Sequence, residues 1–244
     1  MLLESRLTCM NTLASKEPAD DRRSSRSFVR REGRITSAQR HALDVLWPQY
    51  GLDGHGDAID RVAVFGRHAP LELEIGCGNG DALIEMATAR PEHDFIGIEV
   101  YRPGVGKLLK GIAEAELDNV RIVNHDAVEF IGERIAPTSI KRVMVYFPDP
   151  WPKKRHHKRR LLNSSFIGLV AERLEPDEQL HIATDWQEYA EFIMQNVSQE
   201  PLLCNTCGTG NFAPRPSSRP LTRFEQRGQR LGHEVFDIVT VRIP

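Results

Sequence analysis

The 244-residue sequence contains little cysteine and no long apolar segment. Its four cysteines are too few and too scattered to form a disulfide framework in a chain of this size. No stretch reaches the roughly 18 apolar residues that crossing a bilayer requires, and the N-terminus lacks the apolar core of a secretory signal. We therefore expect a cytoplasmic protein that does not enter the membrane.

The sequence also lacks a recognisable set of metal ligands. Cys204 and Cys207 form a single C-x-x-C pair, which supplies two of the four ligands of a structural zinc site, and no matching second pair is present. We therefore expect no metal and no redox function.

The formal net charge of -2 hides a strong asymmetry along the chain. Residues 1–40 contain nine Lys or Arg against five Asp or Glu, residues 151–160 contain six against none, and residues 214–230 contain five against one. The other 177 residues therefore total -16, so an acidic body has three basic regions. This distribution is typical of a protein that binds a polyanion, although any single basic run can also be solvated surface.

Short apolar runs alternate with helical stretches from about Leu71 onward. The apolar runs predict strands at 71–75, 94–100, 120–124, 142–147, 179–184 and 235–243. Helices are predicted between them, at 80–89, 103–115, 127–135, 161–173 and 186–197. This alternation predicts an α/β fold with a doubly wound, mostly parallel sheet and helices on both faces. Ligands of such sheets bind at the carboxyl ends of the strands.

Two segments fall outside this alternation. Residues 1–35 are polar, charged and without periodicity, which predicts a disordered basic arm. The basic stretch 22–40 either wraps a polyanion such as RNA or acts as a solubilising tail. Residues 36–244 are expected to form one domain, in which the Pro/Gly-rich stretch 208–220 predicts a functional loop or a lid.

A glycine loop follows the first predicted strand of the regular region. Gly76 and Gly78 lie between this strand and a helix, where glycine permits a sharp turn and a close approach of ligand to backbone. Asp81 occupies the position of the third glycine of the dinucleotide fingerprint, which disfavours a nicotinamide cofactor. Glu99 ends the next strand, where a carboxylate can bind both hydroxyls of a ribose. The pattern favours an adenosine-containing ligand, although glycine turns and acidic strand ends also occur for purely structural reasons.

Two further acids follow the third and fourth strands of this region. Asp126 is a candidate for the adenine end of the ligand, or alternatively the N-cap of the next helix. The fourth strand continues into "FPDPWPKKRHHKRR", which puts Asp149 and Trp151 at the ligand edge of the sheet. Prolines stiffen this loop, and the six Lys or Arg that follow can contact phosphates.

Six motifs occur in one order along the chain: "LEIGCGNG", "FIGIEV", "HDAVEF", "FPDPWPKKRHHKRR", "ATDWQEYA" and "RPLTRFEQRGQRLGH". Together they resemble the tRNA (guanine-N7)-methyltransferase family, and the resemblance extends from about Arg34 to the C-terminus. It implies a class I methyltransferase fold that uses S-adenosylmethionine to methylate N7 of the guanine at position forty-six in the tRNA variable loop. It also implies tRNA as the partner, and we expect that no protein partner is required.

The resemblance assigns roles to individual residues by motif. Binding of S-adenosylmethionine is implied for Glu74, Gly76, Gly78, Glu99, Asp126 and Asp149. Asp149 is also implied to be catalytic. Substrate contacts are implied for Lys153, Asp185, Thr222, Arg223, Phe224 and Glu225. RNA contacts are implied for Arg155, His156, His157, Lys158, Arg159 and Arg160.

Several of these residues have a second interpretation. Asp185 and Glu225 are candidates to accept the two protons that guanine offers at N1 and its exocyclic amine, but both also fit the spacing of a helix capping box. Trp151 or Trp186 is a candidate to lie beside a flipped base, and Trp151 fits simple loop packing equally well. His156 and His157 lie among cations, which disfavours their protonation.

Three other functions remain open at this point. An S-adenosylmethionine enzyme that methylates an exocyclic amine has a similar loop after its fourth strand, but Trp151 stands here in place of a second proline and a basic run follows. An RNA-binding scaffold without turnover would not need the acids and glycines of a cofactor site together. A nicotinamide-dependent oxidoreductase is disfavoured by Asp81.

Overall fold

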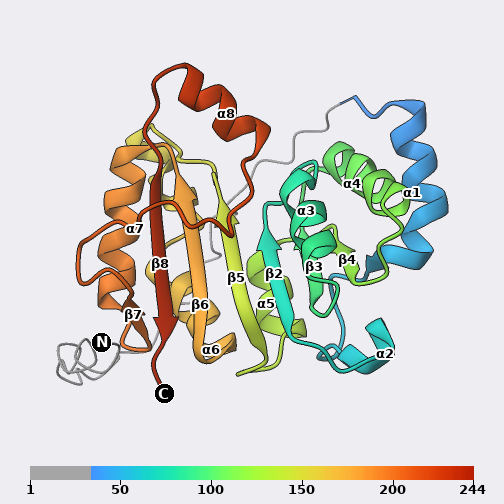
Figure 1. Cartoon of the computed structure of the whole chain (residues 1–244), viewed down its shortest axis with the longest axis horizontal. Coiled ribbons are helices and arrows are strands. Elements are labelled where there is room, and N and C mark those ends of the chain that lie inside the picture. Colours follow the sequence, from blue (N-terminus) through green and yellow to red (C-terminus); the bar gives the residue numbers. More distant parts are fainter. Residues whose placement is uncertain (1–33) are drawn as a thin grey trace.

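The computed structural model describes residues 34–244, and these form a single eight-stranded sheet with helices on both faces (Figure 1). The predicted α/β fold is therefore confirmed, whereas the predicted arm lies outside the described residues except for its last two. The strands are β1 (Gly51–Leu52), β2 (Leu71–Ile75), β3 (Asp94–Ile98), β4 (Val120–Val123), β5 (Ile140–Tyr146), β6 (Leu174–Thr184), β7 (Leu203–Asn205) and β8 (Phe236–Arg242). The α-helices are α1 (Ser37–Tyr50), α2 (Arg61–Phe65), α3 (Asp81–Ala89), α4 (Arg102–Glu114), α5 (Ala127–Arg134), α6 (Ser164–Arg173), α7 (Gln187–Gln199) and α8 (Arg223–Arg230).

The strand order is β1-β4-β3-β2-β5-β6-β8-β7. Neighbours from β1 to β6 are parallel, and β8 runs antiparallel to both β6 and β7. After β2, the chain adds β3 and then β4 on one side of the sheet. After β5, which pairs with the other edge of β2, it adds β6 on the opposite side. The point where the winding reverses lies between β2 and β5, which is where an open sheet of this kind forms a ligand crevice.

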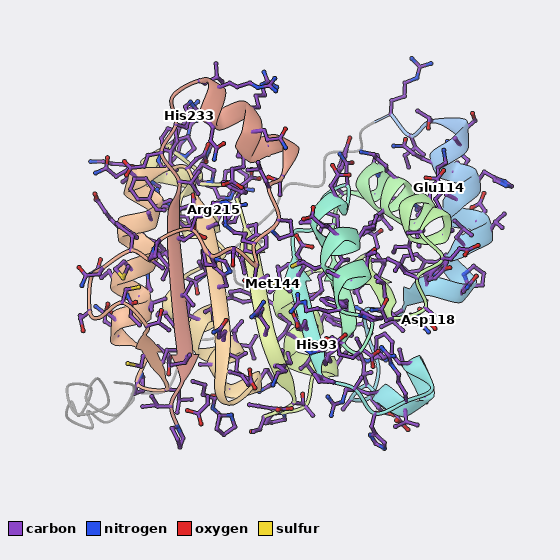
Figure 2. The ribbon with its side chains drawn as sticks, in the orientation of Figure 1. His93, Glu114, Asp118, Met144, Arg215 and His233 are labelled. Carbon is purple, nitrogen blue, oxygen red and sulfur yellow. The ribbon has the colours of Figure 1, made fainter. Side chains whose placement is uncertain are left out.

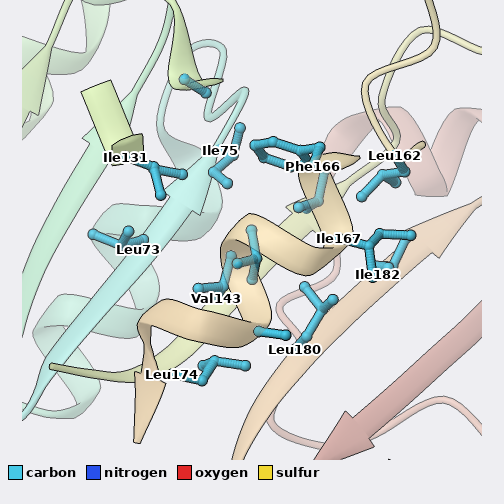
Figure 3. Close-up of a cluster of buried hydrophobic side chains, with 14 of the residues drawn as sticks. Leu73, Ile75, Ile131, Val143, Leu162, Phe166, Ile167, Leu174, Leu180 and Ile182 are labelled. Atoms are coloured by element: carbon cyan, nitrogen blue, oxygen red, sulfur yellow. The ribbon is translucent and has the colours of Figure 1, made fainter. Parts of the chain in front are cut away.

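Two apolar clusters hold the helices on the sheet. One face packs against α1, α3 and α4 around Leu83 and Leu108, and the other against α5, α6 and α7. Figure 3 shows Leu73 of β2, Val143 of β5 and Ile167 of α6, which all belong to the second cluster. Each fully buried aliphatic side chain of this kind stabilises the fold by roughly 1.5–3 kcal/mol. β2 and β3 are buried on both faces, although β2 alternates its apolar residues with Glu72 and Glu74.

The predicted strands and helices of the regular region are all present, with shifted ends. The largest shift is in β6, which begins at Leu174 rather than at 179, because Leu174 pairs with Ile140 before an irregularity in the ladder. Five of the strands and α-helices were not predicted: α1, α2, β1, β7 and α8. Of these, α1 begins with a capping box in which Thr36 and Gln39 exchange side-chain to backbone hydrogen bonds.

The segment between β7 and β8 crosses the face of the sheet before it forms α8 (Figure 1). A bridge from Ala213 to Asp237 of β8 fastens it to the sheet, and α8 lies at the end where the parallel strands finish (Figure 1). The stretch 208–220 is irregular, as predicted. Within residues 34–244, no helix is both long and apolar enough to cross a bilayer.

Candidate active site

A pocket of about 250 Å³ opens where β2 and β5 finish side by side. Its walls come from the ends of β2, β3 and β5 and from the loops after them. Three of the six predicted cofactor residues line it: Gly76, Glu99 and Asp149. The other three adjoin lining residues in the chain or through a hydrogen bond: Glu74, Gly78 and Asp126. The pocket therefore lies at the edge of the sheet that the sequence indicated.

Backbone amides hold the carboxylate of Glu99 in place. The N–H of Gly78 donates to Oε2 and that of Tyr101 donates to Oε1, each at 2.7 Å. Gly78 has a φ of 57°, a left-handed conformation that glycine adopts at little cost, and this turns its amide toward the carboxylate. Burial is the main cause that raises the pKa of Glu99; the amides oppose the shift, and the charge of Asp149 adds to it. Each oxygen has a further lone pair that can accept a ligand hydroxyl.

Glu74 is an unpaired acid beneath the pocket. It is 4% exposed, and its Oε2 has no hydrogen-bond partner among residues 34–244. Burial raises the pKa of Glu74 to about 8, and the nearby charge of Glu99 contributes. A buried carboxylate without a partner is costly, so a cationic group placed beside it would stabilise the ionised form.

Asp126 caps α5. Its Oδ1 accepts hydrogen bonds from the backbone N–H groups of Val128 at 2.7 Å and Glu129 at 3.4 Å. The capping interpretation is thus confirmed. Since one oxygen makes both bonds, capping leaves the carboxylate able to bind a ligand as well.

The loop after β5 is held in an unusual conformation. Phe147 and Trp151 have φ values of 53° and 46°, in the left-handed region that costs a bulky residue about 1–2 kcal/mol. The N–H of Phe147 donates to the carbonyl of Ala183 at 2.7 Å, which ties the start of the loop to β6. Asp149 lies between the two strained residues, with an exposed side chain at the wall of the pocket. The sequence predicted a stiff loop here but not its left-handed residues.

The basic run after this loop forms a short 3₁₀ helix, Lys154–Arg159. Four of its cationic side chains are exposed: Lys153, Lys154, Arg155 and Lys158. Three more side chains are half-buried: His156, His157 and Arg159. The run follows Asp149 and precedes Leu161, both of which line the pocket. Positive charge is therefore concentrated beside the pocket, as RNA binding requires.

Arg160 differs from its neighbours because it is only 2% exposed. Its Nε donates to the carbonyl of Pro150 at 2.9 Å, and its Nη2 donates to Glu188 at 3.2 Å. Its guanidinium also lies 5.1 Å from the ring centres of Tyr189 and Phe192. The prediction of an RNA contact is therefore wrong for Arg160, whose side chain anchors the loop to α7.

Trp151 packs within the basic run. The guanidinium of Arg159 lies 5.3 Å from its ring centre, and the ring of His156 meets it edge-on at 5.7 Å. These contacts confirm the loop-packing interpretation of Trp151. The pKa of His156 lies below its ordinary value because of desolvation and because of neighbouring cations, first among them Arg155 and then Arg159. The predicted effect of those cations is therefore confirmed.

A buried ion network fastens the C-terminal segment to the sheet. Arg219 donates to the two oxygens of Glu225 at 2.6 and 2.9 Å and to Oδ2 of Asp237 at 3.0 Å. Asp237 contacts His181 at 2.7 Å, and His181 contacts the hydroxyl of Tyr146 at 3.2 Å. Since Tyr146 lines the pocket, these contacts link α8 to the pocket wall. No pattern in the sequence indicated this network.

Glu225 belongs to this network and not to the pocket surface. Arg215 adds a second guanidinium to its carboxylate at 3.0 Å, and Figure 2 shows Arg215 below α8. Both oxygens of Glu225 are bonded to arginines and the residue is 1% exposed, so this structure does not present it to a base, and its predicted contact with guanine stays a prediction. Its backbone N–H donates to the hydroxyl of Thr222 at 3.1 Å, which confirms Thr222 as the helix cap.

Asp185, unlike Glu225, is not a capping residue and is not buried among arginines. α7 begins at Gln187 with Trp186 as its N-cap and no side-chain capping bond, so the capping interpretation of Asp185 is wrong. Its half-buried carboxylate instead contacts Nδ1 of His233 at 3.2 Å, near α8 (Figure 2). Asp185 is therefore able to accept further hydrogen bonds.

Exposed aromatic side chains occur next to Asp185 in the chain and on α8. Trp186 is 40% exposed, and Phe224 of α8 is 56% exposed with its ring 5.0 Å from that of Phe147. The side chain of Arg223 lies outside the described part of the chain. Flat apolar surfaces of this kind suit contact with a base.

Comparison with known proteins identifies relatives that match most of the chain. Residues 68–238 match a family model described as "Putative methyltransferase". The chain is 50% identical over 218 residues to the tRNA (guanine-N(7)-)-methyltransferase of Halorhodospira halophila, covering 89% of this chain and 94% of that protein. It is 48% identical over 237 residues to the protein of the same description from Hydrogenovibrio crunogenus, covering 96% and 99%.

Solved structures share the fold at low identity. The 16S rRNA methyltransferase KamB aligns with a TM-score of 0.55 and 12% identity, covering 78% of this chain and 96% of that one. An rRNA methylase from Streptococcus thermophilus aligns with a TM-score of 0.50 and 11% identity, covering 87% and 100%. These likenesses show a class I methyltransferase fold.

We predict that Glu74→Gln stabilises the free protein increasingly as the pH rises. The raised pKa of Glu74 means that the folded state loses stability between the ordinary value of 4.5 and about 8, because deprotonation favours the unfolded chain. The variant should therefore gain about 1.4 kcal/mol per pH unit relative to the parent over this range. Urea unfolding at several pH values measures the difference. The matched control is Glu85→Gln on the exposed surface of α3, and equal pH profiles for the two variants would contradict the assignment.

We predict that Arg219→Met lowers the free energy of unfolding by about 3–5 kcal/mol, because it removes the guanidinium that two buried carboxylates share. Arg215→Met, at a side chain that is 35% exposed, should cost about 1 kcal/mol or less. Urea unfolding compares the two. Similar small losses for both would show that the buried network does not hold the segment.

Proposed function

The chain belongs to the tRNA (guanine-N(7)-)-methyltransferase family, and we propose that it transfers a methyl group from S-adenosylmethionine to N7 of the guanine at position forty-six in the variable loop of tRNA. The observation that supports this most directly is the pocket between β2 and β5, which has buried acids inside and a basic 3₁₀ helix at its rim. We further propose that the protein acts in the cytoplasm and needs no second protein subunit.

The acids of the pocket fit S-adenosylmethionine. The unpaired carboxyl of Glu74 suits the cationic methionyl end of this cofactor, and the fixed carboxylate of Glu99 suits its ribose hydroxyls. Asp126 follows β4 at the same edge and suits the adenine. When bound, the cofactor supplies a methyl group on a positively charged sulfur.

The chemistry requires little proton transfer from the protein. N7 of guanine has a lone pair and no proton to remove, so a general base is unnecessary. The chain must instead hold the accepting nitrogen in line with the methyl group and stabilise the positive charge that develops on the purine. Asp149 can do both, because the strained residues on either side of it fix its place at the pocket wall.

Asp185 is the candidate for distinguishing guanine from adenine. A carboxylate accepts the N1 and amine protons of guanine but meets an acceptor at N1 of adenine. Asp185 keeps a half-buried carboxylate near exposed Trp186 and Phe224, whereas Glu225 is occupied by arginines. We propose that Asp185 reads the base and that Thr222 and Phe224 border it.

The test is incubation of the full-length protein with labelled S-adenosylmethionine and unmodified tRNA, followed by mapping of N7-methylguanine through base-induced strand cleavage. We expect cleavage at one variable-loop guanine. Asp149→Asn should lower kcat by about 100-fold or more, because it removes the charge that supports the cationic purine. Near-normal turnover in that variant would remove Asp149 from the mechanism. Label on an exocyclic amine or in protein would point to the amine-methylating alternative, and tight cofactor binding without transfer would point to a scaffold.

Two neighbouring arginines provide a matched test of RNA binding. Arg155 is exposed, so Arg155→Ala should weaken tRNA binding and reduce the slope of log affinity against log salt by about 1. Arg160 is buried, so Arg160→Ala should leave that slope unchanged while lowering the free energy of unfolding by about 1–3 kcal/mol. Filter binding at several salt concentrations and urea unfolding measure both effects. An equal loss of salt dependence in the two variants would contradict the assignment.

A further inference from the structure

We propose that His55, His125 and Glu129 form a binding site for a divalent transition-metal ion, with zinc the ion whose preferences fit best. One ligand atom from each residue lies within 4.8 Å of the other two. Two imidazoles and one carboxylate are a common protein ligand set for zinc, and water completes the tetrahedron. His55 follows β1, whereas His125 and Glu129 lie at the start of α5.

A hydrogen bond with Glu133 favours the tautomer of His55 that a metal ligand requires. The Nδ1 atom of His55 lies 2.9 Å from Oε2 of Glu133, one turn further along α5 than Glu129. An ionised carboxylate only accepts hydrogen bonds, so Nδ1 carries a proton, and in the neutral imidazole Nε2 then keeps its lone pair. A histidine that donates one ring N–H to a carboxylate while its other nitrogen faces a metal is a recurrent feature of zinc sites.

His125 contributes its Nε2 atom, which lacks a well-aligned hydrogen bond to the described residues. Its Nε2 lies 2.8 Å from Oε2 of Glu129 but is a buried atom without a well-aligned hydrogen bond to any described residue. The two imidazoles also meet edge-on, with ring centres 4.3 Å apart. An ion between these nitrogens and the carboxylate would satisfy His125 Nε2, which a simple His–Glu pair does not.

The backbone brings His55 to this position. Nη1 of Arg134 donates to the carbonyl of Asp53 at 2.9 Å and also to the carbonyl of His55. Gly54 lies against His125 so closely that a Cβ would stand 2.4 Å from the ring. The loop is therefore held against α5 before any ion binds, which lowers the entropic cost of assembling the ligands.

Only small movements are needed to reach zinc geometry. Bonds of about 2.0 Å in a tetrahedron place ligand atoms roughly 3.3 Å apart, between the 2.8 Å of the close pair and the 4.8 Å limit of the set. The side chains of His55 and Glu129 are 66% and 48% exposed, so both can rotate. Glu129 and Glu133 supply the negative charge that a divalent ion requires.

The site adjoins the pocket, because His125 is one of its lining residues. A bound ion would fasten the loop after β1 to the start of α5 at the edge of the pocket. The sequence predicted no metal, because the ligands lie far apart along the chain and become neighbours only when β1 pairs with β4.

Equilibrium dialysis of the full-length protein against zinc, without RNA or S-adenosylmethionine, tests the proposal. We expect one ion per chain that is lost in His55→Ala and in Glu129→Gln. His41→Ala, at an exposed histidine of α1, is the matched control and should bind as the parent does. Glu133→Ala should weaken binding about tenfold, because it frees His55 to change tautomer.

Cobalt distinguishes this site from the cysteine pair. Cobalt bound by nitrogen and oxygen ligands should show visible bands without the near-ultraviolet thiolate bands that Cys204 or Cys207 would produce. Absence of binding, binding that survives His55→Ala, or thiolate bands would overturn the proposal. Because ion binding is measured without RNA or methyl donor, its failure is separate from any failure of methyl transfer.

Discussion

The parallel pairing of β2 with β3 on one side and with β5 on the other is the constraint on which the site depends. Glu74 stands opposite Gly97 and Met144 in this ladder, and Glu99 and Asp149 follow the ends of the two neighbouring strands. Parallel strands finish at one edge, so three acids that lie far apart in the sequence converge there. A slip of one residue in β2 would turn Glu74 to the opposite face and separate it from the others.

Two buried glutamates in this molecule, Glu225 and Glu74, have opposite electrostatic environments. Glu225 is surrounded by Arg215 and Arg219, so its charge is balanced and the segment containing it is fixed to β8 through Asp237. Glu74 has no such partner within residues 34–244, and its burial raises its pKa to about 8. The paired charge of Glu225 holds a segment of the fold in place. The unpaired carboxyl of Glu74 lowers the stability of the free protein, and a cationic ligand beside it would offset that loss.

The regular part of the fold was predictable because apolar runs and helical periodicity are local properties of the sequence. α1 was missed although Thr36 and Gln39 form a capping box, since short capping motifs are common and the helix buries few side chains. The candidate site was predictable where glycines and acids follow strands, as at Glu99. It was not predictable for Arg160 and Glu225, whose burial depends on partners brought together only by the completed fold.

Acidic and basic side chains lie at different depths around the pocket. Acids lie within or beneath the pocket, while the cations of the 3₁₀ helix stand exposed at its rim beyond Asp149. A polyanion is attracted to the rim but repelled from the interior, and a small cation is favoured in the interior. The two proposed ligands, a cationic methyl donor and tRNA, therefore have distinct places, and they meet where Asp149 lies between the acidic and basic regions.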